Sequence, residues 1–177
     1  RKLYLNYRTT DEIRRQAVAL LEGCEVDDLD DGHDETKRYK SLSRGPAPVV
    51  VQADGLEAAA AQTIAFVKAL RGEAADGQTP TICVIASSEK TREAMAKQLL
   101  AAGLAGVTIT AQSNHDDARD KVHFATMHRA KGLEFDAVVV VAPQSYFGDA
   151  EQTVNQRKLM YVALTRAKRA AMLISVG

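Results

Sequence analysis

Short apolar runs alternate along this chain with longer segments in which apolar residues recur every three or four positions. The short runs predict β-strands at residues 3–5, 49–51, 81–86, 107–110, 122–126, 137–142 and 171–176. The longer segments predict helices at about residues 10–21, 56–70, 87–102 and 154–164. Strands that alternate with helices in this way are typical of a mostly parallel, doubly wound sheet, so the pattern predicts an α/β domain.

Polar residues at the boundaries of these segments support the predicted helices. Asp54 together with Glu57 offers an amino-terminal cap for the helix at 56–70. Ser87-Ser88 is expected to open the helix that follows the next strand. Residues 137–142 are apolar throughout, which predicts a central strand that is buried on both faces of the sheet.

Residues 25–45 differ in kind from the rest of the chain. Seven carboxylates fall in the first eleven of these residues, four basic residues follow, and few apolar side chains interrupt them. A calcium-binding loop with Gly32 as its sixth residue is excluded, because Leu29 and Arg38 would then occupy positions that require oxygen ligands. The composition therefore predicts a flexible loop, acidic in its first half and basic in its second, or a site from which a longer segment was excised.

The overall composition is that of an ordinary globular chain, and its length predicts one domain over residues 1–177. Hydrophobic residues make up 46% and charged residues 26% of the chain. Lysine plus arginine equals aspartate plus glutamate at 23 each, so any contact with nucleic acid must come from local basic groups. Cys24 and Cys83 match no metal-binding spacing and are expected to be reduced thiols.

No apolar run approaches the roughly 20 residues that a membrane span needs, and no secretory signal opens the chain. The expected location is therefore the cytoplasm, without a membrane partner. Residues 1–5 are already strand-like and lack an initiator methionine, so the sequence is expected to be a segment of a longer polypeptide.

The sequence lacks the motifs of a complete catalytic site. It contains no G-x-x-x-x-G-K-[ST] phosphate loop and no G-x-G-x-x-G fingerprint after a strand. No predicted strand ends in paired acidic residues suited to Mg²⁺, and the four scattered histidines predict no metal site. A bound nucleotide would therefore need its phosphate loop and its metal ligands from another domain.

The first candidate segment is Asn6-Tyr7-Arg8-Thr9, between a predicted strand and a predicted helix. Open α/β sheets bind ligands at the carboxyl ends of their strands, where a ring can stack on a base and a guanidinium can reach phosphate oxygens. Tyr7 and Arg8 are therefore candidate nucleotide contacts. A core tyrosine beside a surface arginine is the alternative.

The second candidate segment connects two predicted strands. Thr126 and His128 offer a hydroxyl and an imidazole, and Arg129 and Lys131 offer two cations, for contacts with phosphates. Gly132 permits a close approach of the backbone, and Glu134 can accept hydrogen bonds from sugar hydroxyls. A polar loop without any ligand is the alternative.

The third candidate segment follows the last predicted helix. Three cations, Arg166, Lys168 and Arg169, stand directly after this helix. Cations at the carboxyl end of a helix compensate its dipole, and this is the expected role of Lys168 and Arg169. Arg166 is the candidate for contact with a ligand.

Taken together and in this order, the three segments resemble motifs IV, V and VI of superfamily-one DNA helicases, specifically of the UvrD/Rep/PcrA branch. The resemblance is carried most specifically by Thr126-x-His128-x-x-Lys131-Gly132-Leu133-Glu134-Phe135-Asp136 and by Tyr161-Val162-Ala163-Leu164-Thr165-Arg166-Ala167. The related RecD-like branch tends to have glutamine where Lys131 stands, which favours the UvrD-like side. The resemblance implies the second RecA-like motor domain of a helicase, of the P-loop NTPase type but without a P-loop of its own.

The resemblance also implies roles at a site for ATP and Mg²⁺. Tyr7 would stack on adenine, and Arg8 would approach the γ-phosphate. Glu134 would contact the nucleotide sugar, and Arg166 would act as an arginine finger. The phosphate loop and the Mg²⁺ ligands would belong to an amino-terminal RecA-like domain of the same polypeptide.

A track for single-stranded DNA is implied as well, with Thr126, His128 and Arg129 along it. The UvrD-like form of motif V favours translocation from 3′ to 5′. The fragment by itself is expected to be inactive, because it holds only half of the ATP site. A non-catalytic helicase-like module that binds DNA or serves as a scaffold is the alternative function.

The spacing of the motifs departs from the family pattern. Relatives carry a large helical subdomain between motifs IV and V, whereas Arg8 and Thr126 are only 118 positions apart. Predicted strands and helices fill most of that interval, so the subdomain is expected to be missing or reduced to residues 25–45. Duplex unwinding therefore does not follow from the resemblance.

Overall fold

The computed structural model describes four continuous stretches of the chain, residues 48–74, 79–110, 120–147 and 154–177. Before residue 48 it describes Ile13, Arg15 and the short strands β1 (Tyr4–Asn6), β2 (Asp27–Asp28), β3 (Gly32–His33) and β4 (Tyr39–Ser41). Tyr7, Arg8 and most of the helix predicted at 10–21 lie outside the described residues.

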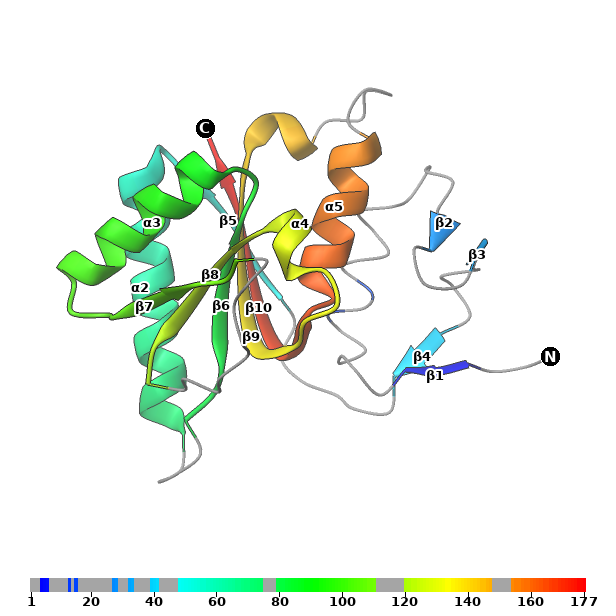
Figure 1. The fold of residues 1–177 in the computed structure, drawn as a ribbon, viewed down its shortest axis with the longest axis horizontal. Helices are drawn as coiled ribbons and strands as arrows, with labels where there is room; N and C mark the ends of the chain where they lie inside the picture. Colours follow the sequence, from blue (N-terminus) through cyan, green and yellow to red (C-terminus); the bar gives the residue numbers. More distant parts are fainter. Residues whose placement is uncertain are drawn as a thin grey trace.

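A six-stranded sheet forms the centre of the fold (Figure 1). Its strands, in spatial order, are β5 (Val49–Ala53), β10 (Ala167–Val176), β9 (Phe135–Pro143), β6 (Ile82–Ala86), β8 (Val122–Thr126) and β7 (Gly106–Thr108). Every pair of neighbours in this sheet is parallel. The predicted central strand is β9, whose residues from 137 to 142 are all buried, as its apolar sequence predicts.

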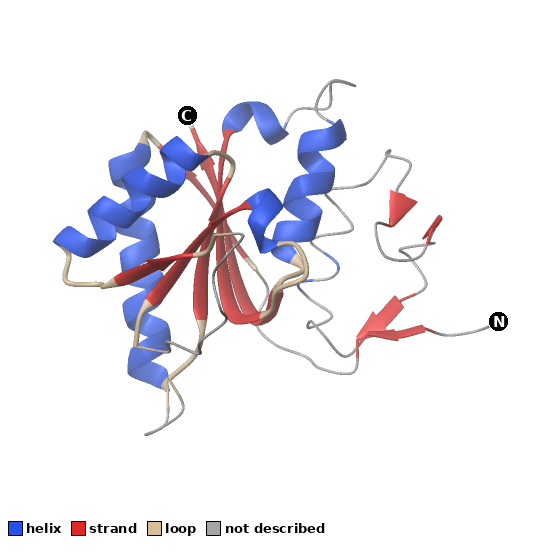
Figure 2. Ribbon diagram, in the orientation of Figure 1, coloured by secondary structure: helices blue, strands red, loops and turns tan. Residues whose placement is uncertain are grey.

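Helices cover both faces of the sheet (Figure 2). Helices α2 (Leu56–Glu73) and α3 (Glu89–Ala101) lie on one face, and α4 (Met127–Ala130) and α5 (Val154–Leu164) lie on the other. A short 3₁₀ helix, η2 (Gln144–Phe147), follows β9. The predicted α/β class with a doubly wound parallel sheet is therefore confirmed.

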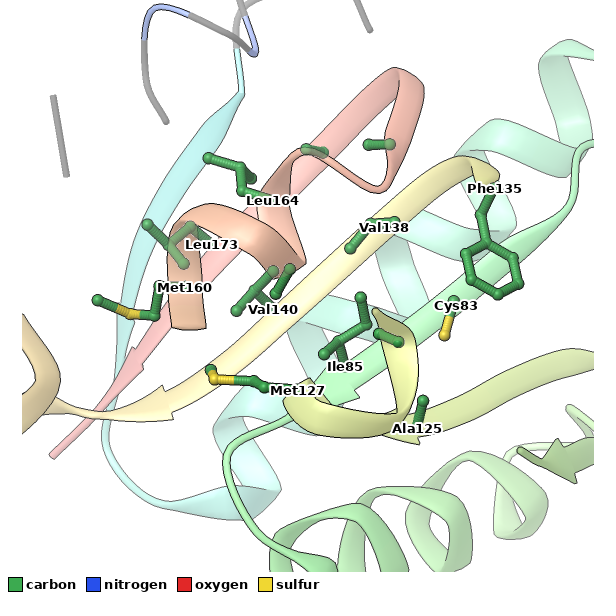
Figure 3. Close-up of a cluster of buried hydrophobic side chains, with 14 of the residues drawn as sticks. Cys83, Ile85, Ala125, Met127, Phe135, Val138, Val140, Met160, Leu164 and Leu173 are labelled. Atoms are coloured by element: carbon green, nitrogen blue, oxygen red, sulfur yellow. The ribbon is translucent and has the colours of Figure 1, made fainter. Parts of the chain in front are cut away.

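Side chains of β9 alternate between the two faces and join two separate cores. Val139 and Val141 pack with residues of α2 and α3, whereas Val138 and Val140 pack with residues of α4 and α5. Figure 3 shows the second of these cores, into which Met127 extends from α4. Burial of these apolar groups anchors both short helices of this face to the sheet.

The start of α3 follows the prediction, and the start of α2 does not. Ser88 is the N-cap of α3, and its Oγ accepts a hydrogen bond from the amide of Thr91 at 3.2 Å. At α2 the N-cap is Gly55, with a φ of 91° and no side-chain cap, and Asp54 is exposed one residue earlier. The predicted Asp54 cap is wrong because the chain turns at the glycine, which tolerates this left-handed conformation.

The strands before residue 48 belong to two small separate sheets. β1 pairs in parallel with β4, and β2 pairs in antiparallel fashion with β3. Figure 1 places these strands apart from the central sheet, on the side of α5. The stretch at 25–45, predicted as a loop, therefore contains regular structure, because backbone pairing does not require apolar side chains. Its flexibility and the single domain over 1–177 stay predictions.

Candidate functional site

The parallel sheet separates the described candidate residues into two groups at its opposite ends. Thr126 is the last residue of β8, so it lies at the carboxyl edge of the sheet. Glu134 directly precedes β9 and Arg166 directly precedes β10, so both lie at the amino edge. The structure therefore brings Glu134 and Arg166 together and keeps them apart from Thr126.

Glu134 and Arg166 are held together by pairing of their two strands. The amide of Phe135 donates a hydrogen bond to the carbonyl of Arg166 at 2.9 Å, and Ala167 is opposite Phe135 in the β9–β10 register. We call the region around Glu134, Arg166 and Lys168 the amino-edge corner. Residues distant in the sequence thus meet at one position fixed by the backbone.

Arg166 completes the carboxyl end of α5. Its side chain is buried, and its Nε donates a hydrogen bond to the carbonyl of Val162 at 3.0 Å. One guanidinium nitrogen lies 3.5 Å from the hydroxyl of Thr165, which itself donates to the carbonyl of Tyr161 at 2.9 Å. These bonds satisfy carbonyl groups that a helix end leaves without partners.

The predicted helix-end role of Lys168 and Arg169 is wrong. The chain passes from α5 into β10 through only Thr165 and Arg166, so Lys168 and Arg169 already lie within the strand. Both side chains are exposed there. Lys168 Nζ instead lies 4.0 Å from Glu134 Oε2, an ion pair within the amino-edge corner.

Asp136 has a structural role that the motif alone does not reveal. Its Oδ2 accepts hydrogen bonds from the amide of Thr81 at 3.0 Å and from the Thr81 hydroxyl at 3.2 Å. Its own amide donates to the same hydroxyl at 2.8 Å. These bonds join the amino ends of β6 and β9 and so fix the backbone that carries Glu134. Because 55 positions separate the two residues, no local sequence signal indicates this pairing.

The segment after Thr126 is a single helical turn with its polar side chains facing outward. Met127 and Ala130 are buried, whereas His128 and Arg129 are exposed. Apolar residues three positions apart lie on one face of a helix, so this pair anchors α4 and leaves the two polar residues at the surface. The sequence predicted a connecting loop here, and this apolar spacing was the signal for the helix.

Gly132 ends this segment for a conformational reason. Its φ is 82°, and no atom lies within 4 Å of the position that a Cβ would take. The glycine therefore serves the left-handed turn that leads to Glu134. The predicted close approach of another group to this glycine is not seen among the described residues.

Two other potentially reactive side chains among the described residues, Cys83 and His123, are buried. Cys83 is a free, fully buried thiol, and burial raises its pKa far above the ordinary value. His123 is buried against Phe135, with ring centroids 5.5 Å apart. No group of three or more metal-binding side chains occurs within the described residues.

A shallow cavity of about 270 Å³ lies at the carboxyl edge, on the side of α2 and α3. The residues that line it are Leu56, Lys90, Thr91, Pro143 and Val176. None of the candidate residues that the structure describes lines this cavity. The cavity and the amino-edge corner are therefore separate features.

The described stretch from β8 to β10 also carries a recognisable family pattern. Residues 121–174 match the family model of the UvrD-like helicase C-terminal domain. The chain resembles the C-terminal domain of UvrD-like helicases. The match includes the whole of α4, β9 and α5. It therefore includes both motifs that carry the resemblance, the one from Thr126 to Asp136 and the one from Tyr161 to Ala167.

Curated relatives support this UvrD-like resemblance over a short segment. A probable DNA helicase of Mycoplasma pneumoniae is 41% identical over 65 residues, which are 32% of this chain and 12% of that protein. The ATP-dependent DNA helicase Rep of Buchnera aphidicola is 36% identical over 59 residues, which are 30% of this chain and 9% of that protein. The chain thus spans about a tenth of the length of these relatives.

A solved structure supports the fold over nearly the whole chain. The C-terminal domain of a possible DNA helicase from Lactobacillus plantarum WCFS1 superposes with a TM-score of 0.71 at 24% identity. The similarity covers 97% of this chain and 88% of that one. The RecA-like fold expected from the motifs is therefore confirmed.

None of the described helices combines the length and the apolar character needed to cross a membrane.

Proposed function

We propose that this chain is the second motor domain of an ATP-dependent DNA helicase or translocase. One observation supports this proposal above the others: the β9–β10 pairing brings Glu134 and Arg166 to the same edge of the sheet. These are the two described residues for which the UvrD-like motifs imply nucleotide contacts. A scaffold that never meets a nucleotide has no need to place them together.

The chemistry of the amino-edge corner suits one side of a bound nucleotide. Arg166 supplies positive charge for phosphate oxygens, and the carboxylate of Glu134 accepts hydrogen bonds from sugar hydroxyls. We assign the adenine contact to Tyr7 and a second γ-phosphate contact to Arg8. Mg²⁺ and the phosphate loop are assigned to an amino-terminal RecA-like domain of the same polypeptide, which would bind ATP first.

Arg166 would have to change partners to act as an arginine finger. Its guanidinium now donates to Val162 and lies beside Thr165, with its side chain buried. When the two motor domains close over ATP, the γ-phosphate would replace these neutral acceptors. Charge-assisted hydrogen bonds are the stronger ones, so the exchange is favourable once water is excluded. It would neutralise charge that develops on the transferred phosphoryl group.

The carboxyl edge would carry part of the track for single-stranded DNA. Thr126, His128 and Arg129 present a hydroxyl, an imidazole and a cation around α4, and the last two residues are exposed. Such groups bind the phosphate backbone without reading sequence, and the binding weakens as salt increases. The UvrD-like motif V favours movement from 3′ to 5′ along the strand.

The decisive experiment substitutes Arg166 in the complete protein, which includes the first motor domain. Arg166→Ala should reduce DNA-stimulated ATP hydrolysis by about 10³-fold or more, the size of effect known for arginine fingers. ATP binding, measured by calorimetry, should persist. Arg169→Ala is the matched control, because it removes a nearby exposed arginine, and it should keep most of the activity.

A second variant guards against a folding defect, because Arg166 also completes the end of α5. Arg166→Lys keeps the charge and one donor nitrogen but loses the planar guanidinium, so its activity should also drop strongly. Circular dichroism should show native helix content in the variants used. Hydrolysis within tenfold of the unaltered protein in a folded Arg166 variant would exclude the finger assignment.

A further inference from the structure

The start of β10 pairs irregularly with β9, and this irregularity changes which of its side chains are exposed. Ala167 is opposite Phe135 and Ala170 is opposite Ala137, so β10 places two residues where β9 has one. This is the pattern of a β-bulge, which leaves one residue unpaired and redirects neighbouring side chains. Bulges are frequent beside functional sites for this reason.

The bulge places Lys168 and Arg169 side by side at the surface. In a regular strand, successive side chains point to opposite faces of the sheet. Here both residues of the bulge are exposed, whereas β10 is buried from Ala170 to Ser175. The exposed, charged start of β10 is therefore confined to these two residues, and it borders the amino-edge corner.

The two cations of the bulge differ in what they contact. Lys168 Nζ lies 4.0 Å from Glu134 Oε2, with side chains 45% and 37% exposed, respectively. Arg169 makes no ion pair within the described part of the chain. The adjacent Arg166 guanidinium donates a hydrogen bond to the carbonyl of Val162 at the end of α5.

We propose that Lys168 is a positioning residue of the nucleotide half-site, placed by the β10 bulge so that its ammonium orients the Glu134 carboxylate toward the nucleotide sugar. This inference rests on the proposed function, because it takes the sugar contact of Glu134 as given. A glutamate side chain loses conformational freedom when it binds, and a charged neighbour that restricts it beforehand reduces that loss. Closure over ATP would exclude water and strengthen the attraction between the two charges.

The test is a steady-state kinetic comparison in the complete protein with ATP, 2′-deoxy-ATP and 3′-deoxy-ATP. Lys168→Met removes the charge but retains the length of the side chain. It should raise KM for ATP about two- to fivefold, the range that exposed ion pairs support, and leave kcat within about twofold. Lys168→Arg should restore KM, because it restores the cation. Arg169→Met, the matched control from the same bulge, should leave KM unchanged.

Discrimination between ATP and its deoxy analogues separates this inference from the proposed function. Glu134→Gln should reduce the preference for the intact sugar, and Lys168→Met should reduce the same preference by less. In the double variant Glu134→Gln with Lys168→Met, loss of the lysine should change neither KM for ATP nor the sugar preference any further.

Each contrary outcome has its own meaning. If Glu134→Gln loses the sugar preference while Lys168→Met retains both KM and that preference, the positioning role is wrong and the proposed function stands. If Lys168→Met raises KM equally with and without Glu134, the lysine contacts the nucleotide itself and does not act through the carboxylate. If Glu134→Gln leaves the sugar preference intact, the sugar contact in the proposed function is wrong, and the positioning role with it.

Discussion

At the amino edge of the sheet, Arg166 is buried and hydrogen-bonded to the end of α5, and Asp136 joins two strands beside it. At the carboxyl edge, His128 and Arg129 extend into solvent from one helical turn that is anchored by Met127. The first group is fixed by backbone pairing and buried bonds, whereas the second keeps the freedom of surface side chains.

This difference matches what the two proposed ligands require. A group that acts on a phosphoryl transfer must be held close to its final position before the reaction, because a misplacement of about 1 Å can cost on the order of 10² in rate. Contacts with a nucleic-acid backbone tolerate more freedom, because they are electrostatic and repeat along the strand. The comparison predicts that substitutions at the amino edge affect stability and that those around α4 at the carboxyl edge affect DNA affinity.

Asp136→Ala should have the largest effect on stability. It removes a carboxylate that accepts two hydrogen bonds and leaves Thr81 without these acceptors, so the free energy of unfolding should fall by about 2–3 kcal/mol. Urea denaturation measures this change. Thr81→Val keeps the amide bond to Oδ2 but also removes two hydrogen bonds, the one from the hydroxyl to Oδ2 and the one from the Asp136 amide to the hydroxyl, so it should lose a similar amount. Unchanged stability in Asp136→Ala would show that these bonds do not fix the amino edge.

The double variant His128→Ala with Arg129→Ala should reduce affinity for single-stranded DNA by about tenfold, or about 1.4 kcal/mol, in the complete protein. The dependence of affinity on salt should become less steep, because a phosphate contact is lost. Fluorescence anisotropy with a labelled oligonucleotide at several salt concentrations gives both values. The control is Lys97→Ala with Lys90→Ala on the exposed side of α3. An equal loss of DNA affinity in this control would mean that binding depends only on the overall positive charge.

Ser88→Ala tests a part of the carboxyl edge that carries no proposed DNA contact. Loss of the N-cap bond to Thr91 should reduce the free energy of unfolding by about 1 kcal/mol. Ser88→Asp should keep the cap and the stability. DNA affinity should be unchanged in both variants, so a change there would extend the proposed track to α3.

His128→Ala alone should have the smallest effect on folding. Its side chain is exposed, so stability should change by less than about 0.5 kcal/mol. Differential scanning calorimetry of this variant beside Asp136→Ala compares the two edges directly. Destabilisation of similar size in both would remove the distinction between a fixed amino edge and an adaptable carboxyl edge.

Much of the sheet could be predicted because each strand is marked by a run of apolar residues within its own short segment of sequence. The strand at 122–126 and the helix at 154–164 match β8 and α5, since apolar spacing alone determines both. The motif residues Glu134 and Arg166 were also found from sequence, and their meeting follows from the β9–β10 pairing, which no local pattern indicates.

The errors arose where the position of a turn decides a residue's role. Asp54 had the right chemistry for a cap, but the chain turns one residue later, at Gly55. Lys168 and Arg169 had the right charge for a helix end, but the connection from α5 to β10 is too short to leave them there. Two-residue connections and long-range partners such as Thr81 and Asp136 become visible only in three dimensions.

The position of β10 has a consequence for how the domain is made. This strand is the last of the six in sequence, yet it lies between β5 and β9. Residues 54–176 must be synthesised before the whole of β5 can pair with that neighbour, which takes about 6–25 s at ordinary rates of translation. During this interval the valines of the nascent β5 lack a partner strand and are suited to pairing with other chains. Chaperone protection should matter most for this stretch, and a chain that stops before β10 should aggregate.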